Sequence, residues 1–203
     1  QTDWPSSTLQ TGFPYFEQPS LPVDRVVADF LGSGEPPLVF TLGSIVAHFE
    51  PDFYREAFDA AIRLQRRAIL LTGSGAIRIG RSNPKILAVD YARLHEILPR
   101  SAAVVHAGGI GTCGEALRAG IPSVIIPFSF DQPDNAQRMK RLGVAEILSR
   151  RSIKATAIAI KLERVLRDPS YTLLARNCAN QINNDPTMDL VLDKMESLRA
   201  SVE

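Results

Sequence analysis

The sequence predicts an α/β fold of three layers, in which helices cover both faces of a parallel sheet of about six strands. Short apolar runs without alternation recur along the chain, as in strands that are buried on both faces. Amphipathic segments lie between these runs, which is the order of strands and helices in doubly wound folds. The length of 203 residues suffices for a large domain with a substantial core.

The elements follow one another in a regular order. Residues 1–22 are rich in proline, serine and aromatic residues and show no periodicity, so we expect a linker or an edge segment there. Apolar runs predict strands at 37–43, 68–71, 86–89, 102–105, 123–126 and 143–147. Helical periodicity and glycine or proline boundaries predict helices at 23–31, 51–66, 113–119, 155–166, 170–182 and 189–202, with a short helix ending at Leu98 and another beginning near Asp134.

Composition excludes several classes of function. The formal net charge of +1 gives no reason to expect nucleic acid or an anionic membrane as the partner. The two cysteines, Cys113 and Cys178, make neither a disulfide framework nor a metal site. No apolar run approaches the ~20 residues of a membrane span and no signal peptide is visible, so we expect a cytoplasmic protein. The sequence begins at Gln1 and not at a methionine, so we expect a piece of a longer protein.

A glycine-rich turn between a strand and a helix predicts an anion site. The sequence His106-Ala-Gly-Gly-Ile-Gly-Thr112 lies directly after the apolar run 102–105. Glycines let the backbone approach a ligand, and a helix N-terminus presents N–H groups with a partial positive charge. Together these features favour a phosphate or diphosphate. We expect Gly109 and Gly111 at this site, with Thr112 adding a hydroxyl and His106 a nitrogen. A plain tight turn is the alternative.

Polar side chains nearby extend the predicted site from a phosphate to a sugar. Glu115, one helical turn after Thr112, could accept hydrogen bonds from a sugar diol. Asp131 and Gln132 follow the next strand, on the same rim of a parallel sheet, where open α/β folds bind ligands. Capping of the following helix by Asp131 or Asp134 is the alternative. A diphosphate, a ribose and a second sugar along one rim describe a nucleotide-sugar.

The segment 101–141 resembles the donor-binding signature of nucleotide-sugar-dependent glycosyltransferases of the GT-B fold. That signature reads approximately HHGGxGT, then ALRAG-P, then PFxxDQ-xNA in the bacterial and sterol-type branch. The resemblance implies a Rossmann-like domain that is one half of a GT-B fold, with the donor-binding domain over 23–187, the linker over 1–22 and a C-terminal helix over 188–203 that packs against a missing N-terminal domain.

The resemblance also assigns roles to individual residues. It implies that Gly109, Gly111 and Thr112 bind the donor diphosphate, that Glu115 binds the ribose, and that the pair that follows the next strand, Asp131 and Gln132, holds the sugar hydroxyls. The sequence departs from the family at Ala107, where a second histidine usually contacts the α-phosphate; only His106 remains.

The same resemblance implies roles for Ser44 and Tyr91, which follow two other predicted strands. Ser44 matches a Gly-Ser pair near the donor phosphates or the acceptor, and a plain turn is the alternative. Tyr91 lies where the plant signature has a tryptophan that stacks on uracil, and a tyrosine can stack similarly. The backbone of Ala92 to Leu94 would then read the edge of the base.

The resemblance implies the donor half of an inverting hexosyltransferase, which moves a sugar from a UDP- or dTDP-hexose to an acceptor hydroxyl on a lipid or small molecule. It implies that this chain holds no catalytic residue, that the general base lies in the missing N-terminal domain, and that the fragment alone is inactive. We expect no cofactor and no metal, because the chain has no DxD-like acidic cluster. A membrane contact is expected only through a lipid acceptor.

Three alternatives stay open at this point. A UDP-sugar epimerase shares the fold but requires acid and base carboxylates from both domains. A non-catalytic nucleotide-sugar-binding subunit would complete its site by docking on a partner. A dinucleotide-binding oxidoreductase fits poorly, because the glycine loop comes late in the chain and lacks the full GxGxxG after a first strand.

Overall fold

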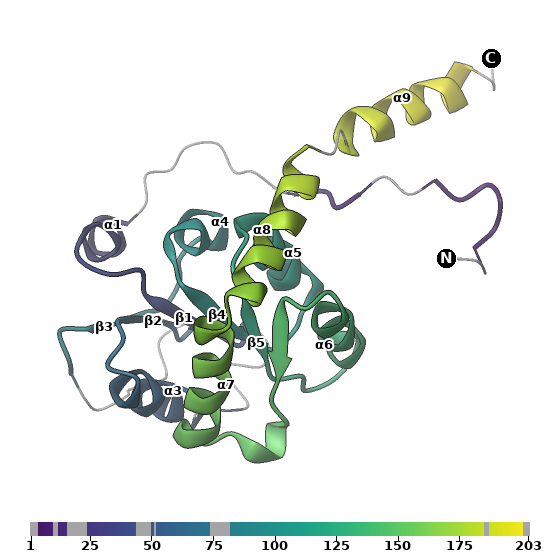
Figure 1. The fold of residues 1–203 in the computed structure, drawn as a ribbon. Helices are drawn as coiled ribbons and strands as arrows, with labels where there is room; N and C mark the ends of the chain where they lie inside the picture. Colours follow the sequence, from purple (N-terminus) through teal and green to yellow (C-terminus); the bar gives the residue numbers. More distant parts are fainter. Residues whose placement is uncertain are drawn as a thin grey trace.

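The described part of the chain contains a six-stranded parallel sheet with helices on both faces (Figure 1). The computed structural model describes residues 4–9, 12–15, 24–43, 50, 52–73, 82–184 and 187–200. The strands are β1 (Leu38–Thr41), β2 (Ala68–Leu71), β3 (Ile86–Val89), β4 (Ala103–His106), β5 (Ser123–Ile125) and β6 (Ala145–Ile147). They lie in the order β3-β2-β1-β4-β5-β6, and every neighbouring pair is parallel. The predicted Rossmann-like α/β fold is confirmed.

The helices match the predicted segments closely. They are α1 (Arg25–Gly32), α3 (Asp52–Arg63), α4 (Leu94–Ile97), α5 (Ile110–Ala119), α6 (Gln132–Arg141), α7 (Ala155–Arg167), α8 (Pro169–Asn183) and α9 (Thr187–Ala200), with short 3-10 helices at Leu98–Arg100 and Arg150–Ser152. Side-chain caps mark two of the starts, because Asp24 accepts a hydrogen bond from the backbone N–H of Val26 and Asp168 one from Ser170.

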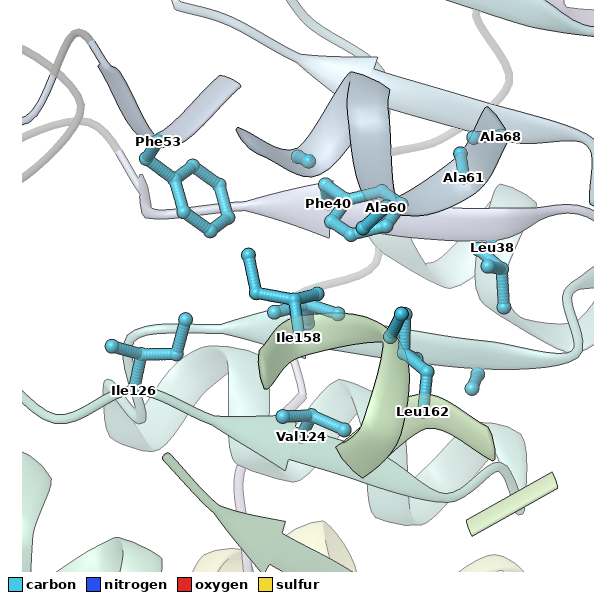
Figure 2. Close-up of a cluster of buried hydrophobic side chains, with 14 of the residues drawn as sticks. Leu38, Phe40, Phe53, Ala60, Ala61, Ala68, Val124, Ile126, Ile158 and Leu162 are labelled. Atoms are coloured by element: carbon cyan, nitrogen blue, oxygen red, sulfur yellow. The ribbon is translucent and has the colours of Figure 1, made fainter. Parts of the chain in front are cut away.

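Apolar side chains fill the space on both sides of the sheet. Helices α3 and α7 cover one face, over a cluster that Figure 2 shows in close-up and that includes Leu38, Phe40, Phe53, Val124, Ile158 and Leu162. Helices α1, α4 and α5 cover the other face, over a cluster that includes Val27, Val39, Ile69, Ile97, Val104 and Ala116. Successive residues of β1 thus point to opposite clusters, as strand geometry requires. The helices on the two faces and the sheet between them form the three predicted layers.

The chain reverses direction across the sheet between β1 and β4. From β1 the chain moves outward through β2 to the edge strand β3, and then returns to β4 on the other side of β1. Thr41 and His106, the last residues of β1 and β4, are register partners. In open parallel sheets ligands bind in the crevice at such a switch point, outside the carboxyl ends of the strands. The glycine-rich turn follows directly from this point.

Helices α5, α6 and α9 begin two or three residues earlier than predicted, α9 at Thr187 and not at Asp189. Helix α5 begins at Ile110 and not at Cys113, because Gly109 serves as its N-cap and its carbonyl accepts from the N–H of Cys113. Helix α6 begins at Gln132 and not at Asp134, because Pro133 is accommodated in the first turn, where no N–H is required. The predicted end of α5 is confirmed, since Gly120 takes the left-handed conformation with φ 67°.

The two ends of the chain differ in how they contact the sheet domain. A segment of the expected linker, residues 12–15, packs on α5: the Tyr15 hydroxyl donates to the carbonyl of Gly114 at 3.0 Å. Helix α9 extends away from the domain in Figure 1 and leaves Met195 and Leu198 exposed. These two apolar side chains of the predicted C-terminal helix therefore lie on the surface of the described part. No helix in the described ranges is both long and apolar enough to cross a membrane.

Candidate functional site

His106 lies beneath the glycine turn with its side chain 1% exposed. Its Nδ1 accepts a hydrogen bond of 3.1 Å from the backbone N–H of Gly108, so the proton of the neutral ring is on Nε2. Nε2 is buried without a hydrogen-bond partner among the described residues. Burial lowers the pKa of His106 to about 4, which keeps the imidazole uncharged at neutral pH. The buried ring therefore stabilises the glycine turn through its hydrogen bond with Gly108.

Gly108 is the point where the turn approaches its neighbours most closely. Its φ of 92° lies in the region that favours glycine, and a Cβ there would be 2.8 Å from Ile125 Cγ2 and 3.2 Å from the carbonyl oxygen of Gln132. The glycine thus allows the β4–α5 turn to lie against β5 and the start of α6. Neighbouring Ala107, the position that departs from the family pattern, is also buried.

The first turn of α5 has the properties of an anion site. Its N-cap residue, Gly109, has no side chain to cap the helix, so the first N–H groups of the helix are available to a ligand. A Cβ at Gly109 or Gly111 would meet no atom within 4 Å, so open space lies beside both glycines. Thr112 is partly exposed in the same turn. Predicted residues Gly109, Gly111 and Thr112 are therefore together, next to His106.

Asn135 joins this turn to α6. Its side-chain Nδ2 donates to the carbonyl of Gly108 at 2.9 Å and to the carboxylate of Asp131 at 2.7 Å. The predicted Asp131 is thereby placed at the same edge of the sheet as the glycine turn. Sequence reasoning did not select Asn135 as a site residue, although its spacing of four from Asp131 on a helix indicates contact.

The Cys113 thiol lies within the electrostatic influence of Asp131. Burial raises the pKa of Cys113 to about 12, and the negative charge of Asp131 adds to this shift. A thiol with such a pKa is protonated at neutral pH and is a poor nucleophile. Cys113 is 2% exposed, so its thiol is part of the core beneath α5.

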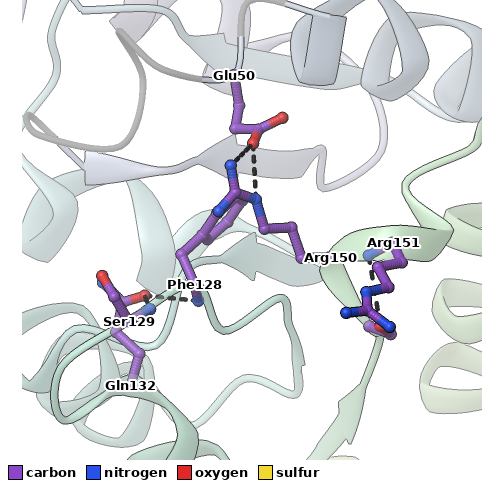
Figure 3. A network of polar contacts seen from close by, with 7 residues as sticks. Glu50, Phe128, Ser129, Gln132, Arg150 and Arg151 are labelled. Atoms are coloured by element: carbon purple, nitrogen blue, oxygen red, sulfur yellow. Dashed lines mark hydrogen bonds and ion pairs between the residues drawn. The ribbon is translucent and has the colours of Figure 1, made fainter.

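Gln132 organises the loop that precedes α6. Its side-chain Oε1 accepts from the backbone N–H groups of Phe128 and Ser129, at 2.8 and 3.2 Å (Figure 3). The guanidinium of Arg150 lies 5.0 Å from the centre of the Phe128 ring and pairs with Glu50. The amide oxygen of Gln132 is therefore engaged within the protein, and its amide nitrogen is the group that can face a ligand.

Glu115 faces a pocket that is separate from these loop contacts. The pocket has a volume of about 330 Å³ and is lined by His95, Pro99, Glu115, Arg118, Ala119 and Asn183. Tyr15 adjoins it, because the Arg118 guanidinium lies 4.7 Å from the centre of the Tyr15 ring. Burial and then the charge of Glu115 raise the pKa of Tyr15, so the phenol and the carboxylate are near one another.

The remaining predicted residues follow β3 or lie outside the described part. Tyr91 is 75% exposed after β3, the edge strand farthest from β5 and β6 on the other side of the sheet. The side chains of Ala92 and Leu94 pack on the apolar cluster that contains Ala116, which leaves only their backbone for a ligand. Ser44 lies outside the described residues. The structure thus links the residues predicted for the diphosphate to Asp131, predicted for the sugar, through Asn135, whereas Tyr91 makes no contact described for that turn.

Known proteins resemble this chain over most of its length. Residues 57–198 match the family model described as the C-terminal domain of erythromycin biosynthesis protein CIII-like proteins. O-mycaminosyltylonolide 6-deoxyallosyltransferase of Streptomyces fradiae is 34% identical over 181 residues, which are 89% of this chain and 42% of that protein. No cluster of three or more potential metal-ligating side chains occurs in the described ranges.

Solved structures share the fold. Spinosyn forosaminyltransferase SpnP has a TM-score of 0.78 at 20% identity, over 93% of this chain and 49% of that one. Glycosyltransferase VinC, solved in complex with dTDP, has a TM-score of 0.76 at 23% identity, over 95% of this chain and 49% of that one. The chain spans less than half the length of the curated relative and of both solved structures.

Proposed function

The chain belongs to the erythromycin biosynthesis protein CIII-like C-terminal domain family and has the fold of the C-terminal half of GT-B glycosyltransferases, and we propose that it binds the nucleotide-sugar donor of such an enzyme. The whole enzyme would transfer a hexose from UDP or dTDP to a hydroxyl of a lipid or small-molecule acceptor, with inversion of the anomeric centre. The name of the relative, a 6-deoxyallosyltransferase, and the dTDP bound to VinC support a dTDP-linked hexose.

The observation that carries this proposal is the uncapped first turn of α5. Gly109 offers no capping side chain, and both Gly109 and Gly111 adjoin open space. Unpaired N–H groups and the helix dipole attract an anion here, and a diphosphate is the donor group that fits. The Asn135 amide fixes the turn against α6 before any ligand arrives.

This arrangement would assist departure of the nucleoside diphosphate. As the bond from the sugar to the phosphate oxygen breaks, negative charge accumulates on that oxygen. N–H groups that are already oriented toward it stabilise the charge without reorganisation. Thr112 would add a hydroxyl donor in the same turn. His106 would hold the turn through Nδ1, and its Nε2–H, which has no partner among the described residues, would be the nitrogen donor for the diphosphate.

The nucleoside and the sugar would occupy opposite sides of this turn. Glu115 would accept a hydrogen bond from the pentose, in the pocket that also contains His95 and Arg118. Asp131 and the amide nitrogen of Gln132 would bind hydroxyls of the hexose. Tyr91 would stack on the base. Ser44, which lies outside the described residues, would bind the diphosphate.

The domain plan follows from the same family. We propose that 1–22 connects to an N-terminal acceptor domain, that 23–187 is the donor domain, and that the helix over 188–203 packs on the acceptor domain. That domain would supply the general base that deprotonates the acceptor hydroxyl. We therefore expect this chain alone to bind the donor without turnover. The whole enzyme would be cytoplasmic and would require no metal, no cofactor and no nucleic acid partner.

Calorimetric titration of the 203-residue chain with UDP, dTDP and GDP tests the proposal. We expect one of these nucleotides to bind, and its affinity to fall about tenfold in Glu115→Ala, the loss of about one charged hydrogen bond. Asp131→Ala is expected to weaken the sugar conjugate more than the free nucleotide. Asp134→Ala is the matched control, since this exposed carboxylate in the same helix pairs with Arg138.

The result that would reject the proposal is the absence of binding by every nucleotide at millimolar concentration. Binding with equal affinity in the wild type and in Glu115→Ala would retain the diphosphate site and reject the assignment of the pentose site. An equal effect of Asp131→Ala and Asp134→Ala would reject the sugar site.

A further inference from the structure

Phe130 combines two features that a surface residue ordinarily avoids. Its side chain is 87% exposed, although it is a large aromatic ring. Its φ of 58° lies in the left-handed region, where a bulky residue is strained. Gln65 is the other described residue besides glycine with a positive φ, at 55°, and it is polar. Strain of this kind persists where the surrounding structure imposes it, and it concentrates at ligand sites.

The loop that carries Phe130 is held on both sides (Figure 3). On one side, the Gln132 side chain binds the backbone N–H groups of Phe128 and Ser129. On the other side, Arg150 stacks over the Phe128 ring. These contacts fix the residues before and after Phe130, so the exposed ring belongs to a loop with a defined conformation.

The position of Phe130 relates it to the proposed sugar site. It directly precedes Asp131, which is tied through Asn135 to the carbonyl of Gly108 in the glycine turn. Ile110, at the start of α5 in that turn, is 54% exposed and is a second apolar side chain on this edge. The edge thus presents polar groups for hydroxyls and an aromatic ring beside them.

We propose that Phe130 determines sugar specificity by packing its ring against the apolar face of the donor hexose. This inference rests on the proposed function. A hexose ring carries hydroxyls around its rim and carbon-bound hydrogens on its faces, and a 6-deoxyhexose adds a methyl group. Asp131 would bind the rim while Phe130 covers a face, so the contact selects sugars with an unobstructed apolar side. The contact lies beyond the diphosphate and leaves nucleotide affinity unchanged.

Phe130→Gly separates this role from a merely structural one. Glycine relieves the backbone strain and removes the ring, so the variant is expected to unfold at a temperature equal to or above that of the wild type. Gln65→Gly is the matched control, because it relieves the same kind of strain at the end of α3, away from the site. Phe130→Tyr retains an aromatic face.

The readout is the ratio of affinities for a sugar conjugate and for free dTDP, by calorimetry on the 203-residue chain with dTDP, dTDP-glucose and dTDP-L-rhamnose. We expect Phe130→Gly to keep its dTDP affinity within about twofold and to lose roughly tenfold for the conjugate that binds better, as for loss of one aromatic contact. Gln65→Gly and Phe130→Tyr are expected to match the wild type.

Three results would overturn the inference. The first is an unchanged ratio in Phe130→Gly, and the second is an equal loss for dTDP and its conjugates, which indicates a disturbed loop. The third is a wild type that binds no conjugate more tightly than dTDP. A wild type that binds neither UDP nor dTDP would reject the proposed function itself, and it is recognised in the titration with free nucleotide alone.

Discussion

Substitution of Gly108 by alanine tests whether the glycine turn is packed as tightly as the structure indicates. The added Cβ would lie 2.8 Å from Ile125 Cγ2 and 3.2 Å from the carbonyl oxygen of Gln132, and the backbone has φ 92°. Ile125 belongs to the strand β5 and is fully buried, so it has little room to move. The substitution therefore forces either β5 or the start of α6 away from the turn.

The expected cost has two parts. An L-residue in the left-handed region costs about 1–2 kcal/mol relative to glycine. Overpacking of a buried contact by one methyl group costs about 1–3 kcal/mol. Taken together, we expect a loss of about 3 kcal/mol in the free energy of unfolding, which lowers the melting temperature by about 6–12 °C in a domain of this size.

Gly111→Ala is the control for this experiment, because its Cβ would meet no atom within 4 Å. Alanine in a helix is favoured over glycine by up to ~1 kcal/mol, so stability is expected to be equal or higher. The methyl group would instead enter the space proposed for the diphosphate and weaken nucleotide binding. Urea unfolding and dTDP titration of both variants separate the two effects.

Opposite results would refute the reasoning in distinct ways. A Gly108→Ala variant within about 1 kcal/mol of the wild type would show that the turn can relax away from Ile125. A Gly111→Ala variant with normal nucleotide affinity would show that the open space beside α5 does not receive the diphosphate. The two glycines lie in the same turn, so a shared disturbance of that turn would affect both variants equally.

Three other residues yield predictions of their own. Burial lowers the pKa of His106 to about 4, below the ~6.5 of the unfolded chain, so acid favours the unfolded state between these values, and stability is expected to fall by about 2–3 kcal/mol from pH 7 to pH 4.5. Urea unfolding at both pH values checks this, and an equal fall in His106→Asn would contradict it. Gly114→Ala would place a Cβ 3.1 Å from the Phe13 ring, so we expect faster proteolysis of the N-terminal segment without loss of helix stability; an unchanged cleavage rate would count against that docking. Tyr171→Phe removes a hydroxyl that donates to the buried carboxylate of Glu146 at 2.7 Å, at an expected cost of about 1–2 kcal/mol by thermal unfolding, and a neutral effect would indicate that Lys161 and Arg164 satisfy the carboxylate without it.

The sequence predicted the elements best where apolar runs have clear boundaries. Strands β2 and β3 agree with the predicted residues, because each run is continuous and ends beside polar or glycine residues. The starts of α5 and α6 were wrong by three and two residues. In a local pattern glycine and proline indicate a loop, whereas here Gly109 acts as an N-cap and Pro133 occupies a first turn.

Contacts between distant segments could not be predicted from local patterns. Tyr15 and Gly114 are 99 positions apart, and their hydrogen bond leaves no periodicity in the sequence. Arg150 and Glu50 are separated by 100 positions and hold the loop at Phe128. The strain at Phe130 is likewise a property of the folded backbone, since no residue pattern encodes a positive φ at phenylalanine.

The residues at this edge of the sheet fall into two groups, those that fix the glycine turn and those that face open space or solvent. His106, Gly108 and Asn135 direct their polar groups or their close contacts inward and fix the turn. Gly111 and Phe130 face open space or solvent and make no such contribution. Because the inward contacts all arise within the described part of this chain, the outward surface is formed before a ligand or a second domain arrives. A preformed site needs no reorganisation to bind an anion. Under the proposed function, the base that takes the proton from the acceptor hydroxyl would come from the N-terminal domain. If the proposed function holds, substitutions at this edge are therefore expected to change donor affinity, and turnover is expected to require the N-terminal domain as well.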